Sequence, residues 1–130
     1  MGGQARKVRM ALKQDSPGGT SIYQAGAAEQ AGSGEVEVLA LGDWLEQTGG
    51  AFDLLKLDCE GAEWEILRRT SPSAFARFGA LVAEVHDDPE EASPVERFGA
   101  LAEACGFRTV RWERKGKTLY LGVRDRDVRL

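Results

Sequence analysis

Residues 53–67 read DLLKLDCEGAEWEIL, and this segment carries the clearest structural signal in the chain. Phe52 to Asp58 is a compact apolar run that only Asp53 and Lys56 interrupt, which is typical of a strand covered on both faces. Glu60 to Arg69 then has the composition of a helix. The segment predicts a buried strand followed at once by a helix, with Asp58 at the carboxyl end of the strand.

Three acidic residues, Asp58, Glu60 and Glu63, follow one another where this strand ends. At about 100° per residue, helical spacing turns Glu63 into the apolar stripe of the helix and Glu60 toward its border. The solvent face is expected to carry Glu65 with the two arginines that follow. A carboxylate that points into a core must be hydrogen-bonded, paired or protonated.

Two explanations of these acids remain open. In the structural one, Glu60 caps the helix and Glu63 pairs with a nearby base such as Lys56. In the functional one, Asp58, Glu60 and Glu63 line a polar site at the strand end, where open α/β sheets place their ligand crevice.

The segments before this region are weaker in signal. Residues 1–35 are expected to be irregular, with short strands at Lys7–Leu12 and Thr20–Gln24 and a loop over Ala25–Gly34. A short strand near Val36–Leu39 then precedes a helix over Gly42–Thr48 that Gly49 and Gly50 end. We therefore divide the chain into an irregular segment, 1–35, and one domain, 36–130.

The segments after residue 69 predict alternating helices and strands. Ser71 and Pro72 start a short helix to Phe78, and Ala80–Val85 is a second buried strand. Ser93–Glu96 has the pattern of a capping box with proline at the first helical position. The next helix carries one apolar stripe, ends at Gly106, and is followed by a hairpin that turns at Lys115 and Gly116; the stripe is Val95, Phe98, Leu101, Ala102 and Cys105.

Strand–helix–strand alternation indicates an α/β fold with parallel strands, helices on the faces of the sheet, and a C-terminal antiparallel hairpin. The run Asp53–Glu63 resembles the D-L-x-K-x-D-x-E-G-x-E string of the FkbM family of S-adenosylmethionine-dependent methyltransferases. Val38–Leu45 looks like that family's lead-in, and Val82–His86 looks like its next strand, which commonly ends in an acid and a histidine. The resemblance covers about residues 36–123.

The resemblance implies a class I methyltransferase (Rossmann-like) fold and S-adenosyl-L-methionine as the cofactor. It also implies methyl transfer to an oxygen of a small-molecule acceptor, such as a sugar or secondary-metabolite hydroxyl. Asp58, Glu60 and Glu63 match the family's acidic string, and His86 falls where a strand opens onto the crevice. A histidine there suits a general base. In the alternative explanation, His86 is a strand-end residue that is hydrogen-bonded to Asp87 or Asp88.

A class I methyltransferase holds its donor mainly through a glycine-rich turn after the first strand and an acid after the second. Neither pattern is found in this sequence. We therefore expect a C-terminal fragment that is incompetent alone, with no assigned cofactor-binding residues. The unpaired edge of the 52–58 strand is then expected to promote self-association or binding of an N-terminal partner.

Composition and charge limit the classes of protein to which this chain can belong. The formal charge of −4 over 130 residues argues against a nucleic-acid binder, and no run approaches the roughly 20 apolar residues of a membrane span. Cys59 and Cys105 show no zinc or disulfide spacing, so we expect no metal in the leading interpretation and a cytoplasmic protein. Two alternatives stay open: a non-catalytic α/β interaction module, and a magnesium- or manganese-assisted hydrolase that uses the same three acids and His86.

Overall fold

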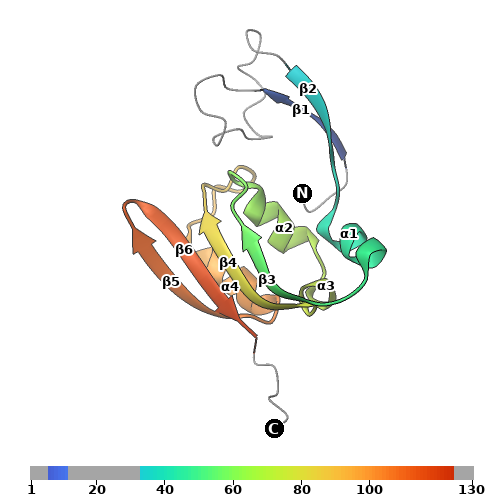
Figure 1. Cartoon of the computed structure of the whole chain (residues 1–130). Coiled ribbons are helices and arrows are strands. Elements are labelled where there is room, and N and C mark those ends of the chain that lie inside the picture. The colour runs from blue at the N-terminus through green and yellow to red at the C-terminus, as the bar shows by residue number, and fades with distance from the viewer. Residues whose placement is uncertain (1–5, 12–32, 125–130) are drawn as a thin grey trace.

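The computed structural model describes residues 6–11 and 33–124, which form two sheets and four helices. A two-stranded antiparallel sheet consists of β1 (Arg6–Ala11) and β2 (Ser33–Val38). Figure 1 shows it to one side of a larger sheet. The expected strand at 7–12 is confirmed, whereas the one at 20–24 lies outside the described residues. Ser33 and Gly34, which were expected to end a loop, belong to β2. β2 also crosses the expected boundary between the irregular segment and the domain, at residues 35 and 36.

The larger sheet has four strands in the order β3-β4-β6-β5. Their bounds are β3 (Phe52–Leu57), β4 (Phe78–Val85), β5 (Arg108–Arg114) and β6 (Lys117–Val123). β3 and β4 run parallel, whereas β6 is antiparallel to both β4 and β5. The fold is thus mixed α/β. The predicted hairpin is confirmed, but among the described residues the parallel arrangement is limited to β3 and β4.

The four helices are α1 (Leu41–Thr48), α2 (Ala62–Arg69), α3 (Pro72–Phe75) and α4 (Glu96–Ala104). Gly49 ends α1 with a φ of 65°, as its position predicts. The Ser71 hydroxyl caps α3 by accepting a hydrogen bond from the Ala74 amide at 3.2 Å. α3 is shorter than expected because β4 already begins at Phe78.

The core lies between the larger sheet and α2 and α4, which cover one of its faces (Figure 1). Trp64 of α2 meets Phe98 of α4 edge-on, with ring centroids 5.3 Å apart, and Phe98 contacts Tyr120 of β6. The predicted stripe of α4 is confirmed in its buried members Phe98, Ala102 and Cys105. This packing fixes the hairpin strand β6 against β4.

The opposite face of the larger sheet is exposed, and this corrects the expectation that the 52–58 strand is covered on both faces. Leu54 and Lys56, which alternate onto this face of β3, are both exposed, and Leu54 is 53% accessible. Four further apolar side chains on β5 and β6 are between 40% and 66% accessible: Val110, Trp112, Leu121 and Val123. Within residues 33–124 no helix covers these side chains.

The predicted capping box at Ser93–Glu96 is wrong. α4 begins at Glu96, and its N-cap residue Val95 is helical in backbone and makes no side-chain capping bond. The Ser93 hydroxyl instead accepts hydrogen bonds from Arg68 at 3.3 Å and from Arg97 at 3.2 Å. A long-range contact with α2 therefore replaces the local contact that the sequence pattern suggested.

Candidate functional site

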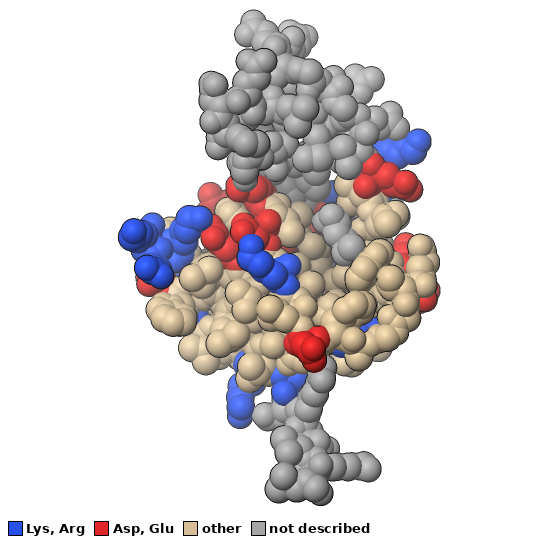
Figure 2. Space-filling view, viewed as in Figure 1, with Lys and Arg blue, Asp and Glu red and all other residues tan. Residues whose placement is uncertain are grey.

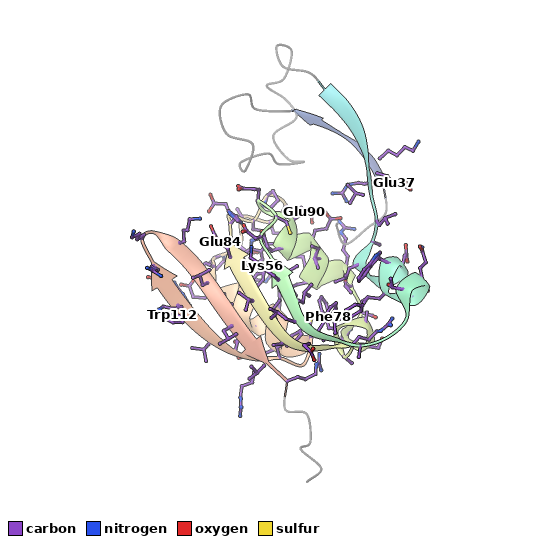
Figure 3. The ribbon with its side chains drawn as sticks, viewed as in Figure 1. Glu37, Lys56, Phe78, Glu84, Glu90 and Trp112 are labelled. Atoms are coloured by element: carbon purple, nitrogen blue, oxygen red, sulfur yellow. The ribbon has the colours of Figure 1, made fainter. Side chains whose placement is uncertain are left out.

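The carboxyl ends of β3 and β4 meet at one edge of the sheet because the two strands are parallel neighbours. Asp58 follows β3 directly, while Glu84 and His86 lie at the end of β4. Figure 3 shows Glu84 close to Lys56 of β3 at this edge. The sheet topology thus gathers three polar side chains from two strands.

A tight turn joins β3 to α2 and determines the position of Glu63. Glu60 and Gly61 have left-handed φ values of 52° and 105°. This conformation brings the Glu63 carboxylate under the turn, where it accepts hydrogen bonds from the amides of Cys59 and Gly61, the second at 2.9 Å. Glu63 and not Glu60 therefore binds the free amides at the start of the helix.

The expected pairing of Glu63 with Lys56 is also wrong. The Lys56 ammonium lies 3.1 Å from the carboxylate of Asp58. The third partner of Glu63 is His86, whose Nδ1 lies 3.0 Å from Glu63 Oε1. Because a carboxylate accepts hydrogen bonds, Nδ1 donates in this contact, and Nε2 is the ring nitrogen left to face the cleft.

His86 is held from two sides. Glu63 is completely buried beneath it, and the indole nitrogen of Trp64 donates to the His86 carbonyl oxygen at 2.8 Å. The expected alternative partners, Asp87 and Asp88, do not take this role, since Asp88 is bound to Arg68 at 3.0 Å. The imidazole is 23% exposed and its Nε2 faces outward, 3.6 Å from Glu84 Oε1 and 3.8 Å from Glu60 Oε2.

These side chains surround an open cleft of about 830 Å³. Three of the four residues singled out by sequence, Asp58, Glu60 and His86, line the cleft, and the fourth lies beneath it. Sequence reasoning did not select two further lining residues, Glu84 and Lys117. Glu84 lies two positions before His86, a spacing that could have indicated a shared face, whereas Lys117 reaches the cleft only because β6 pairs with β4.

The cleft is acidic. Four carboxyl residues line it, and Lys117 is the lysine among its lining residues. The Lys117 ammonium is hydrogen-bonded to Glu84, which raises the pKa of Lys117. Burial raises the pKa of the neighbouring Cys59 thiol, so a protonated, weakly nucleophilic sulfur lies beside the site. The groups that can take part in chemistry here are therefore carboxylates and an imidazole. The four carboxyl residues of the lining are Asp58, Glu60, Glu84 and Asp87.

One subset of these groups has the arrangement of metal ligands. The ligand atoms of Asp58, Glu84 and His86 all lie within 4.8 Å of one another. Glu84 thus takes the place that the hydrolase hypothesis gave to Glu63, whose oxygens are already occupied by three partners. Among the described residues, Asp58, Glu84 and His86 are the group of side chains that could hold a metal ion.

The loop after His86 is fixed by an ion pair between Asp88 and Arg68 of α2. Burial alone would raise the pKa of Asp88, but hydrogen bonds from Arg68, Ser93 and two backbone amides hold that pKa well below its usual range. The Asp88 side chain is completely inaccessible. This pair ties the loop to the helix that carries Glu63.

A second ion pair links the two-stranded sheet to helix α2. Both terminal guanidinium nitrogens of Arg6 in β1 donate to the Glu65 carboxylate, Nη2 at 2.8 Å from Oε2. Glu65 is consequently only 1% accessible, which corrects the expectation that it lies on the solvent face of α2. The partner is 59 residues away in the chain, so the pattern of the helix gave no sign of it.

Comparison with protein families identifies one match over most of this chain. The family model described as the methyltransferase FkbM domain matches residues 4–109. The match begins well before the region of resemblance in the sequence and ends within β5. Comparisons with curated proteins and with solved structures gave no match. Among the described residues, no helix is long and apolar enough to cross a membrane.

Proposed function

Because the chain belongs to the FkbM methyltransferase family, we propose that it takes part in methyl transfer from S-adenosyl-L-methionine to a hydroxyl oxygen. The observation that carries this proposal is the acidic cleft at the carboxyl ends of β3 and β4, where His86 is fixed by a buried carboxylate. Parallel strands joined through α2 support a Rossmann-like arrangement, in which ligands bind at this edge.

The cleft suits the acceptor substrate. Its lining of carboxylates, imidazole and ammonium offers hydrogen-bond partners to a molecule rich in hydroxyl groups, such as a sugar or a polyol metabolite. Apolar contacts are few there, since Trp64 and two valines are the large apolar residues of the lining. We therefore assign the acceptor, and not the donor, to this cleft.

The reaction requires that the acceptor hydroxyl lose its proton as its oxygen attacks the methyl carbon. The carbon–sulfur bond of the sulfonium breaks, its electron pair stays on sulfur, and S-adenosylhomocysteine leaves. The proton passes to a cleft-facing acceptor, for which the geometry offers His86 Nε2 and the carboxylates opposite it, Glu60 and Glu84.

The donor is not held by the turn between β3 and α2. Its amides at Cys59 and Gly61 are occupied by Glu63 and are closed to the carboxylate of a methionine moiety. We expect the main donor-binding residues to come from polypeptide outside residues 33–124. We therefore propose that donor binding needs polypeptide in addition to the described residues.

The test measures donor binding and product formation on this chain and on a version extended with the polypeptide encoded upstream. Calorimetry with S-adenosyl-L-methionine should show binding by the extended protein, and mass spectrometry should detect methylated product with a polyol panel. In that protein, Asp58→Ala and Glu63→Ala should lower turnover, whereas Asp53→Ala on the same strand should not. Unchanged turnover in both cleft variants would mean that these acids are structural.

A further inference from the structure

We propose that Asp58, Glu84 and His86 form a binding site for a divalent cation of the manganese or magnesium class. The three side chains come from the ends of two neighbouring parallel strands, so the backbone fixes their spacing. Their ligand atoms lie within 4.8 Å of one another at the edge of an open cleft. The two carboxylates suit both ions, and the imidazole nitrogen favours the softer Mn²⁺ over Mg²⁺.

The orientation of His86 supplies an independent reason. Glu63 is completely buried and contacts Nδ1, so Nε2 is the ring nitrogen that faces the cleft. Nε2 lies 3.6 Å from a Glu84 oxygen and 3.8 Å from a Glu60 oxygen. A cation in the cleft between these atoms would be within reach of the imidazole and of the Glu84 carboxylate together. In metal sites, a histidine ligand usually donates its other ring N–H to a carboxylate, as His86 can to Glu63.

The dimensions fit after a small adjustment. Ligand atoms at about 2.1 Å from one ion are at most about 4.2 Å apart, so the set must close by several tenths of an ångström. The side chains can make this movement because Asp58, Glu84 and His86 are 39%, 18% and 23% exposed. The cleft of about 830 Å³ leaves the remaining coordination positions open to water or to substrate oxygens.

Two lysines currently neutralise the carboxylates of this set. Lys56 lies 3.1 Å from Asp58, and Lys117 is hydrogen-bonded to Glu84. Both ammonium groups are on largely exposed side chains, 66% and 63% accessible, so either can turn into solvent when an ion enters. Removal of Lys117 should therefore tighten cation binding, which a purely structural cluster would not predict.

The cation site deepens the proposed function, and its role in catalysis rests on that function. A divalent ion bound there would hold the acceptor hydroxyl and lower its pKa. His86 would then serve as a ligand, and the hydroxyl proton would pass to Glu60, which lies next to the ligand set. Binding of the ion itself requires neither donor nor acceptor.

The experiment titrates the full chain with Mn²⁺ and follows the electron paramagnetic resonance signal of the free ion. We expect one bound equivalent, with at least tenfold weaker binding in Asp58→Asn, Glu84→Gln and His86→Gln. Lys117→Ala should bind several-fold more tightly. Glu46→Gln, an exposed acid on α1, is the matched control and should leave the affinity unchanged.

Nitrogen coupling in the pulsed resonance spectrum of Mn²⁺ bound to the unaltered chain tests the histidine ligand without any substitution. Its absence, a lack of binding at millimolar Mn²⁺, or equal affinity in His86→Gln would overturn the proposal. Methyl transfer that survives complete chelation would contradict the catalytic role. If the chain binds Mn²⁺ but the extended protein transfers no methyl group, the proposed function is contradicted and the cation site is not.

Discussion

Glu63 connects the backbone of the turn to the imidazole of the site. Replacement by glutamine keeps its shape, but one oxygen becomes an NH₂ group that faces N–H donors. Because the side chain is completely buried, an unmatched donor there should cost about 1–3 kcal/mol of folding free energy. Urea unfolding of Glu63→Gln should show this loss, and nitrogen NMR should show that His86 no longer keeps its hydrogen on Nδ1. Equal stability and an unchanged tautomer would contradict the assigned role.

Asp88 offers a stability test away from the cleft chemistry. Asp88→Asn leaves Arg68 partly buried without its main partner, although Glu90 and Glu91 remain within 3.8 Å and 3.4 Å. Breaking a buried pair from one side costs about 3–5 kcal/mol, and these remaining acids favour the lower end. Urea unfolding near neutral pH should show the loss, with Glu46→Gln as the control.

The same pair predicts a pH dependence with a definite sign. The pKa of Asp88 is lowered in the folded protein, so its ionisation stabilises the fold above the unfolded pKa of about 4. That contribution is lost as the pH falls below about 4 toward the depressed folded value. The stability difference between the native protein and Asp88→Asn should therefore narrow between pH 6 and pH 2. A constant difference over this range would be inconsistent with a depressed pKa.

At the scale of elements, the turn between β3 and α2 depends on Gly61. Its φ of 105° is unfavourable for other residues, and a Cβ there would lie 3.3 Å from the Asp87 carbonyl oxygen. Gly61→Ala should cost about 1–3 kcal/mol and displace the loop next to His86. Thermal unfolding measures the loss. Gly42→Ala in α1 is the matched control, because its Cβ meets no atom within 4 Å and helical alanine is favoured.

Local patterns predicted most elements because their causes are local. The apolar run at 52–58, the stripe on α4, and the turn at Lys115 and Gly116 each correspond to an observed element. The errors arose where a distant residue decides the outcome. Glu65 is buried by Arg6 and Ser93 is engaged by Arg68, and neither contact has a signature in the nearby sequence.

The candidate site was predictable in part for the same reason. Asp58, Glu60 and His86 follow strands whose ends the sequence located, so their meeting at one edge could be expected. The roles of Glu60 and Glu63 could not, since the left-handed turn at Glu60 removes it from the helix that its spacing assumed. Lys117 depends on the position of β6 between β4 and β5, which hydrophobic alternation does not encode.

At the scale of the whole molecule, the larger sheet has one covered and one exposed face. Figure 2 shows the exposed face, with mostly uncharged side chains over its middle, most charged groups toward its upper rim and a few at its lower edge. It contains Leu54 of β3 at one side and Trp112 of β5 at the other, with Leu121 of β6 between them. Contiguous apolar surface of this kind favours association.

We expect the isolated chain to self-associate through this face and through the edge of β3 that pairs with no other described strand. Sedimentation velocity at tens of micromolar should give a mass above 14.1 kDa that rises with concentration. The double variant Leu54→Lys/Trp112→Lys should shift the distribution to monomer, because both side chains are more than half exposed and a charge there must be desolvated on association. Glu46→Lys adds the same two units of charge on α1 and should not. A concentration-independent monomer for the native chain, or equal dissociation by the control, would mean that this face does not drive association.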